Sequence, residues 1–165
     1  ETVDMVSLVK GVISLFTSRL KEKPLEIHCS FSQETIEAYI DKDKIIQVFT
    51  NLVGNSLKFT ERGDIKITLK DTAEGVECEV FDTGRGIAPE DLLKVFSKFQ
   101  QFGRTDGPGE KGTGLGLSIA KGIVELHRGK IWIESKLGEW TKFTFLLPRI
   151  NPDSMVKEKE RGKDE

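Results

Sequence analysis

Hydrophobic residues recur along this chain at two spacings, and each spacing predicts one kind of element. Spacings of three or four residues indicate amphipathic helices, and they occur at residues 3–20, 42–59 and 115–126, with a further short helix of two or three turns starting at Pro89. Alternation of apolar and polar residues indicates half-buried strands. It occurs at residues 25–31, 35–40, 65–69, 76–80, 130–135 and 141–147.

The order of these elements predicts the fold class. Strands follow one another through turns, such as the one at Gly75, more often than they alternate with helices, so a doubly wound parallel sheet is excluded. We expect an α+β fold, a two-layer α/β sandwich with helices packed on one face of a mixed, mostly antiparallel sheet. One domain should cover residues 1–150, and residues 151–165 should form a charged, disordered tail.

Composition narrows the class of protein. The chain has 37% hydrophobic and 32% charged residues and a net charge of -2, which is typical of a soluble domain and provides no basic surface for nucleic acid. No apolar run approaches the roughly 20 residues that cross a bilayer, and the first residues lack the layout of a signal peptide. We expect a cytoplasmic domain without direct membrane contact.

The cysteines and histidines show no partners at metal-ligand or redox spacing. Cys29 and Cys78 each lie in a strand-like run, and we expect both to be buried, reduced thiols. His28 lies in a predicted strand and His127 closes a predicted helix, and the sequence shows no acidic cluster at ligand spacing around either. We expect structural roles for both histidines.

The predicted helix at residues 42–59 has a narrow polar stripe on an otherwise apolar surface. The stripe consists of Lys44, Gln47, Asn51, Asn55 and Lys58. An exposed helix face usually carries Glu and Lys pairs over a wider arc, so the stripe indicates either a lined pocket or an ordinary exposed edge. The side-chain oxygen of asparagine suits Mg²⁺, a hard cation.

A second polar segment, Asp-Thr-Gly-Arg-Gly-Ile at residues 82–87, follows a predicted strand. A carboxylate at the strand end can accept a hydrogen bond from an exocyclic amine, which would favour adenine over guanine. Alternatively, Asp82 bonds its own backbone in a turn. Gly84 and Gly86 permit positive φ angles and a close approach of the backbone to a ligand.

A third segment, Gly-Thr-Gly-Leu-Gly-Leu at residues 112–117, opens the last predicted helix. Free amides at a helix start bind anions such as phosphate. The spacing is not that of a dinucleotide fingerprint, and no G-x-x-x-x-G-K-[ST] loop occurs. The preceding residues 98–112 are rich in glycine and polar residues, which predicts a mobile loop.

In this order, the three segments resemble the N, G1 and G2 boxes of the catalytic and ATP-binding domain of sensor histidine kinases. The wider group also contains gyrase B, the heat-shock chaperone ATPases and the mismatch-repair ATPases. Residues 95–101 are similar to the F box of those kinases. The resemblance covers residues 1 to about 148 and implies the Bergerat fold, with ATP and Mg²⁺ held between the amide-lined helix and a flexible lid at residues 97–111.

The resemblance implies a role for each matching residue. It makes Asn55 the Mg²⁺ ligand and places the catalytic residues Asn51 and Lys58 near the phosphates. Asp82 would accept from the adenine amino group, and Phe59 would lie against the adenine ring. The other residues expected to bind ATP are Gly84, Gly86, Ile87, Phe99, Gly112, Thr113, Gly114, Leu115, Gly116 and Leu117.

Two positions depart from the pattern of the family. Trp140 stands where the family usually has glycine before its last strand, and Gln101 stands where many members have arginine after the F box. The lid residue that would contact the γ-phosphate is therefore left open.

Position 51 bears on the reaction. Members of the group that hydrolyse ATP have glutamate one turn before the metal-binding asparagine, as the base for water, whereas Asn51 cannot usefully accept a proton. The resemblance implies transfer of the γ-phosphoryl group to a histidine on a separate dimerisation domain. A cognate response regulator would be the next partner. The first residues resemble the junction after that domain, so we interpret the chain as an excised domain. The alternatives are an ATPase of the same group and a nucleotide-sensing interaction module without phosphotransfer.

Overall fold

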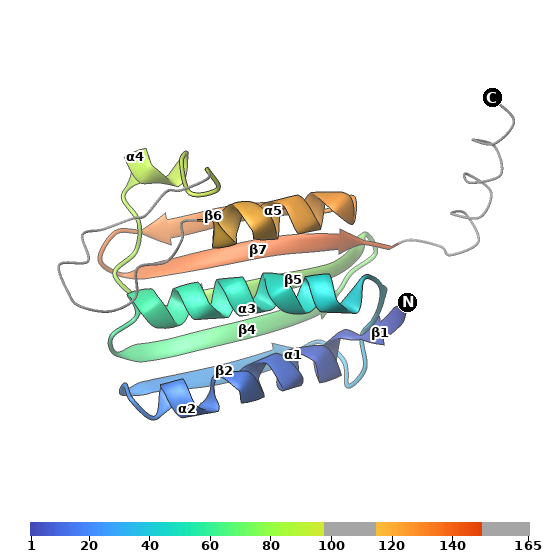
Figure 1. Cartoon of the computed structure of the whole chain (residues 1–165), viewed down its shortest axis with the longest axis horizontal. Helices are drawn as coiled ribbons and strands as arrows, with labels where there is room; N and C mark the ends of the chain where they lie inside the picture. Colours follow the sequence, from blue (N-terminus) through green and yellow to red (C-terminus); the bar gives the residue numbers. More distant parts are fainter. Residues whose placement is uncertain (98–114, 150–165) are drawn as a thin grey trace, which may run out of the picture.

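The computed structural model describes residues 1–97 and 115–149, which form two layers. One layer is a five-stranded sheet whose strands, from edge to edge, are β2 (Leu25–Phe31), β4 (Gly63–Asp71), β5 (Gly75–Asp82), β7 (Trp140–Pro148) and β6 (Lys130–Lys136). β2 and β4 are parallel, and all other neighbours in this sheet are antiparallel. The other layer consists of α1 (Met5–Leu15), α3 (Lys42–Phe59) and α5 (Gly116–Leu126), side by side on one face of the sheet (Figure 1). The predicted fold class is confirmed.

The core lies between these layers, with α3 at its centre. One side of α3 is fully buried, including Phe49, whose ring meets that of Phe145 edge-on with centroids 5.1 Å apart. The facing strands contribute β-branched residues and leucines at alternate positions, including Ile65, Ile67 and Leu69 of β4. Each fully buried side chain of this size contributes roughly 1.5–3 kcal/mol. The packing therefore fixes the rotation of α3, and with it the direction of its polar stripe.

The N-terminal region differs from the single helix predicted at residues 3–20. Its first residues form β1 (Thr2–Asp4), which pairs antiparallel with β3 (Glu37–Tyr39) in a separate two-stranded sheet. α1 begins after Asp4, whose carboxylate accepts from the Val6 N–H at 3.1 Å. α1 ends at Leu15, before a second short helix, α2 (Thr17–Leu20). The Thr17 hydroxyl donates to the Ser14 carbonyl near this break, and such side-chain bonds compete with regular helix bonding.

The remaining predicted elements are present, with small changes in length. α3 has the predicted bounds, and β4 with β5 forms the predicted hairpin. α4 (Pro89–Leu92) begins at the predicted proline but is only four residues long, shorter than predicted. The predicted loop at residues 98–112 and the predicted tail at residues 151–165 lie outside the described residues. Among the described helices, none is both long and apolar enough to cross a membrane.

The predicted burial of the cysteines is only half correct. Cys78 in the central strand β5 is buried, and burial raises the pKa of its thiol well above the usual value. Cys29 is exposed, contrary to the prediction, because β2 is an edge strand of the sheet. Both thiols are free.

Candidate functional site

A cavity of about 140 Å³ opens where the C-terminal part of α3 meets the end of β5 and the start of β7. Five of the predicted site residues line it together: Asn55, Phe59, Asp82, Gly86 and Ile87. They come from one helix, one strand end and the turn after that strand. The helix is separated from the strand end and the turn along the sequence. The structure therefore brings the core of the predicted site into one place.

The polar stripe of α3 divides into two parts. Lys44 and Gln47 are exposed, whereas Asn51, Asn55 and Lys58 are half-buried. The N-terminal part of the stripe is an ordinary solvent-exposed edge, whereas in its C-terminal part Asn55 lines the cavity and Asn51 contacts the start of α5. The exposed-edge interpretation therefore holds for Lys44 and Gln47, and Asn55 is the stripe residue that lines a pocket.

Asp82 is the only charged residue in the described core, with 3% of its surface exposed. Its Oδ1 accepts from the Gly84 N–H at 3.0 Å, as in the turn considered from the sequence. Burial raises the pKa of its carboxyl, while the Gly84 amide and the neighbouring Ser56 and Thr60 hydroxyls oppose that rise. Neither hydroxyl has well-formed hydrogen-bond geometry to any described group, although both are buried. Buried polar groups in this condition are usually satisfied by water or a ligand.

The turn after Asp82 packs tightly against its neighbours. A side chain at Gly84 would bring a Cβ within 2.6 Å of the Phe59 carbonyl oxygen, and one at Gly86 would collide with the Lys136 carbonyl. Gly86 also has a φ of 67°, which other residues rarely adopt. Ile87 is anchored by its N–H, which donates to Ser135 Oγ at 2.8 Å. The glycines are therefore required for the turn to reach both α3 and the β6–β7 hairpin.

Phe59 lines the cavity near two cationic side chains. The Arg85 guanidinium carbon lies 4.2 Å from the centroid of the Phe59 ring, and Lys58 Nζ lies 5.5 Å from it. Lys58 itself is not among the residues that line the cavity. It lies beside the Phe59 ring rather than in the cavity wall.

Asn51 connects α3 to the third segment of the motif. Its Nδ2 donates to the Gly116 carbonyl at 3.0 Å, one turn of α3 before Asn55. α5 begins at Gly116, after Leu115, and no side chain caps its first amides. Such a start can bind an anion. Gly112, Thr113, Gly114 and Phe99 lie outside the described residues.

Several residues of the cavity wall were not predicted from the sequence. They are Arg85, Ala88, Asp91, Leu137 and Thr141. A signal existed for Thr141, because it is a polar residue on the core-facing side of a strand whose next inward positions are Phe143 and Phe145. The unusual Trp140 beside it packs its ring against Phe81 on β5, with centroids 6.0 Å apart.

Larger hollows occur elsewhere in the described structure, including one of about 180 Å³ beside β3 and two that are much larger. One, of about 540 Å³, lies along α1, and the other, of about 620 Å³, lies between the start of α3 and the end of α5. None of these three hollows contains the buried carboxylate, the half-buried amides or the turn at Gly84 and Gly86. We place the candidate site in the smaller cavity because its chemistry, rather than its size, distinguishes it.

The two histidines lie outside this cavity. His127 has the predicted structural role, since its Nδ1 bonds the Ile123 carbonyl at 2.8 Å and its Nε2 accepts from the Asp41 N–H at 3.1 Å. The prediction that His28 has no acidic cluster around it is wrong. Glu26 and Asp64 both approach its ring, because β2 and β4 pair in parallel.

Comparison with known proteins places these features in a family. The family described as "Histidine kinase-, DNA gyrase B-, and HSP90-like ATPase" matches residues 40–151. The chain is 36% identical over 143 residues to the adaptive-response sensory kinase SasA of Synechococcus sp. (strain JA-2-3B'a(2-13)), which is 86% of this chain and 37% of that protein. It is 39% identical over 126 residues to the sensor protein SrrB of Staphylococcus aureus (strain NCTC 8325 / PS 47), which is 76% of this chain and 21% of SrrB. The chain thus spans well under half the length of these relatives.

Solved structures of similar fold include a catalytic domain of a histidine kinase and larger histidine kinase structures. The nucleotide-free catalytic domain of ThkA matches with a TM-score of 0.80 and 33% identity over 90% of this chain and 95% of that one. Full-length ShkA in complex with AMPPNP matches with a TM-score of 0.77 and 31% identity over 92% of this chain and 32% of that one. ThkA in complex with the response regulator TrrA matches with a TM-score of 0.74 and 30% identity over 91% of this chain and 42% of that one.

Proposed function

This chain belongs to the histidine kinase-, DNA gyrase B- and HSP90-like ATPase family, and on that premise we propose that it is the catalytic and ATP-binding domain of a sensor histidine kinase. It binds Mg–ATP and donates the γ-phosphoryl group to a histidine on a separate dimerisation domain of the same kinase. A response regulator then receives the phosphoryl group. The domain acts in the cytoplasm, where ATP is supplied.

The observation that carries this proposal is the buried carboxylate of Asp82 in the wall of the cavity. A carboxylate accepts hydrogen bonds and cannot donate them, so it suits the 6-amino group of adenine and repels the 6-oxo group of guanine. The unpartnered hydroxyls of Ser56 and Thr60 lie beside it, where water or a ring nitrogen could satisfy them. Phe59 supplies an aromatic wall.

The order of residues along α3 supports one orientation of the nucleotide. Phe59 lies at the C-terminal end of α3, near Asp82, whereas Asn51 lies two turns earlier and bonds the first residue of α5. In our proposal, adenine occupies the cavity and the phosphates extend towards the start of α5. Asn55, between the two ends, holds Mg²⁺, which neutralises phosphate charge. Lys58 contributes a further positive charge at the cavity mouth.

Asn51 favours phosphoryl transfer over hydrolysis. A base that activates water must accept a proton, and a carboxamide does not. The Asn51 Nδ2 is, in addition, already bonded to the Gly116 carbonyl. The role of Asn51 in this proposal is to hold α3 and the start of α5 in register around the phosphates, so that catalysis rests on positioning and charge neutralisation.

The proposed function is tested by phosphoryl transfer from γ-labelled ATP. The chain is incubated alone and with the dimerisation domain of the protein that contains it, added as a separate polypeptide. We expect no label on the chain alone, little release of phosphate, and acid-labile label on the dimerisation domain. Transfer should be weak, because the two parts are not tethered.

Matched variants sharpen this test. Asn55→Ala should abolish transfer, whereas Gln47→Ala, on the exposed half of the same stripe, should leave it unchanged. Steady release of phosphate without transfer would instead identify an ATPase. Acid-labile label on the isolated chain that is lost on substitution of His28 or His127 would overturn the proposal.

A further inference from the structure

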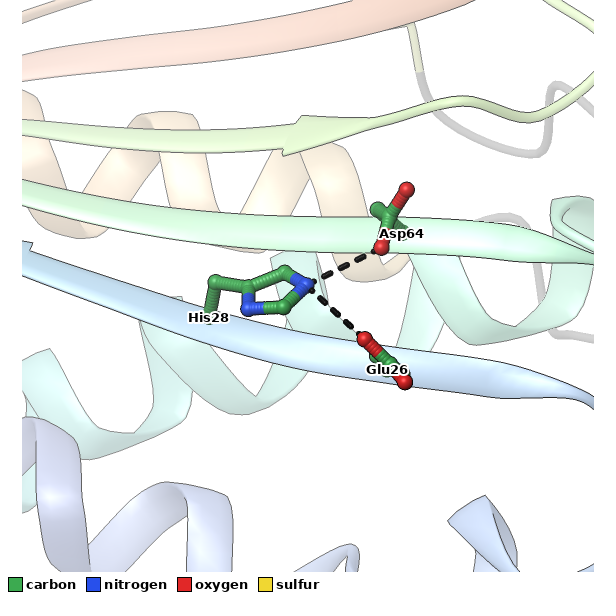
Figure 2. Close-up of side chains that lie close together, drawn as sticks. All are labelled: Glu26, His28 and Asp64. Carbon is green, nitrogen blue, oxygen red and sulfur yellow. Dashed lines mark hydrogen bonds and ion pairs between the residues drawn. The ribbon is translucent and has the colours of Figure 1, made fainter.

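Three potential metal ligands converge on the face of the sheet that carries none of the helices α1, α3 and α5 (Figure 2). The ring Nε2 of His28 lies 3.0 Å from Asp64 Oδ1 and 3.3 Å from Glu26 Oε2. Ligand atoms of the three side chains all lie within 4.8 Å of one another. None of the three side chains lines the proposed nucleotide cavity.

The strands, rather than flexible loops, place these side chains. Glu26 and His28 are two residues apart on β2, so they point to the same side of the sheet. Asp64 is the register partner of Glu26 on the neighbouring strand β4. The Asp64 backbone is itself held by Thr83, since its N–H donates to Thr83 Oγ1 at 2.9 Å and its carbonyl accepts from the Thr83 N–H at 3.1 Å. The arrangement is therefore largely preformed.

The Glu26, His28 and Asp64 side chains are placed to bind a metal ion rather than to share one proton. One imidazole nitrogen carries at most one proton, so it cannot form a full hydrogen bond to Glu26 and Asp64 at once. Zn²⁺ binds nitrogen and carboxylate oxygen at about 2.0–2.2 Å in a tetrahedron, which requires ligand atoms about 3.3–3.6 Å apart. The two separations at His28 already approach this value. Two carboxylates and a neutral imidazole also balance a charge of about +2.

We propose that Glu26, His28 and Asp64 form a binding site for a divalent transition-metal ion, with Zn²⁺ as the ion it fits. Water completes the coordination, because the three side chains are 76%, 51% and 52% exposed, respectively, and an ion can reach them. An imidazole ligand favours Zn²⁺ over Mg²⁺, which prefers oxygen atoms only. The site is thus distinct from the Mg²⁺ position proposed at Asn55, and it does not depend on the proposed function.

Calorimetric titration of the whole chain with Zn²⁺, in a buffer that does not bind metal and without nucleotide, tests the site. We use Cys29→Ser as the background, because Cys29 is an exposed thiol that could bind Zn²⁺ by itself. One saturable site is expected in this background. His28→Ala and Asp64→Asn should each weaken binding by at least about tenfold. The matched control Glu77→Gln removes one negative charge from the same face of the sheet, on β5, and should leave binding unchanged.

A spectroscopic readout identifies the ligand directly. The chain has two histidines, and the His127 ring is fully engaged with Ile123 and Asp41. Zn²⁺ should therefore shift the ring nitrogen resonances of His28 and leave those of His127 in place. Absence of saturable binding, equal binding by His28→Ala, or an equal response to Mg²⁺ at the same concentration would overturn the proposal.

Discussion

The Asp82 carboxyl, which binds adenine in our proposal, lowers the stability of the fold. Burial raises its pKa above the ordinary value of 3.8, and the nearby Gly84 amide and Ser56 and Thr60 hydroxyls do not cancel that rise. Between pH 3.8 and the raised pKa, the folded chain binds more protons at this site than the unfolded chain. The free energy of unfolding therefore falls as the pH rises through this window, and the loss persists at neutral pH.

We predict that Asp82→Asn stabilises the domain at pH 7 in the absence of nucleotide. The amide oxygen can still accept from the Gly84 N–H, while the cost of burying a charge is removed. The gain should disappear near pH 3, where Asp82 is protonated in both the folded and the unfolded states. Urea unfolding at the two pH values measures the difference, with Glu90→Gln, an exposed acid, as control. A loss of stability at pH 7 would show that the carboxylate supports the fold.

Among single residues, the sequence predicts best those site residues that belong to a short local segment. The sequence predicts Asn55 and Asp82 because each belongs to a short segment with its own chemistry, and the resemblance to the family adds Phe59. Thr141 and Leu137 were missed, since only the pairing of β5 with β7, which sets Asp82 opposite Thr141, brings that hairpin to the cavity. Non-local pairing of this kind leaves little trace in local spacing.

At the scale of elements, Asp4 joins the N-terminal strand to two parts of the fold. Its carboxylate accepts from the Val6 N–H at 3.1 Å, the Ser7 hydroxyl at 2.8 Å and the Ile36 N–H at 3.2 Å. Desolvation raises the pKa of this carboxyl, but the bonds from Ser7, Ile36 and Val6 together outweigh it, so the pKa is lowered below 3.8. The stability that Asp4 contributes is present above pH 3.8 and is lost as the pH falls through the lowered pKa.

Accordingly, Asp4→Ala should destabilise the domain by about 1–2 kcal/mol at pH 7, as expected for a helix cap with additional partners. The difference in unfolding free energy between Asp4→Ala and the wild type should shrink at pH values below the lowered pKa, where the folded wild-type chain has lost the charge on Asp4. Urea unfolding provides the measurement. Asp43→Ala, in the first turn of α3, removes a charge near a helix start without a cap bond and should cost less than about 1 kcal/mol. Equal effects of the two substitutions would contradict the capping role.

Glycine is required in the turn at Gly86 but not inside the helix at Gly122. Gly86→Ala combines a left-handed φ with a collision against the Lys136 carbonyl and should destabilise the domain by about 2–4 kcal/mol. Gly122→Ala, inside α5 with no atom near its added Cβ, should stabilise it by about 0.5–1 kcal/mol. Thermal unfolding of both variants tests this contrast. If Gly86→Ala unfolded at the wild-type temperature, the turn would not be as constrained as described.

The sequence predicts elements best where periodicity is long and local signals agree. α3 was predicted with its correct bounds because its apolar pattern runs over five turns between Asp41 and Thr60, its caps. The N-terminal region was not predicted correctly, because β1 is three residues long and is stabilised by pairing with β3 rather than by its own hydrophobic pattern. Val3 fits the helical spacing and yet lies in that strand.

At the scale of the whole molecule, the sheet has two faces with different roles. The face under α1, α3 and α5 (Figure 1) forms the core and, at the end of β5 and the start of β7, the candidate site. The other face carries charged residues, among them the Glu26, His28 and Asp64 cluster. The two-layer class could be predicted from the order of elements. The exposure of Cys29 could not, since it depends on β2 lying at the edge of the sheet.

The most direct test of the central claim, that Asp82 holds adenine in this cavity, is calorimetric titration of the domain with Mg–ATP and Mg–GTP. We expect ATP to bind, and GTP to bind at least about tenfold more weakly, because a donor is replaced by an acceptor opposite a buried carboxylate. Asp82→Asn should lose most of the affinity for ATP, despite its higher stability. Equal affinity for ATP and GTP, or unchanged binding of ATP by Asp82→Asn, would show that Asp82 does not hold adenine.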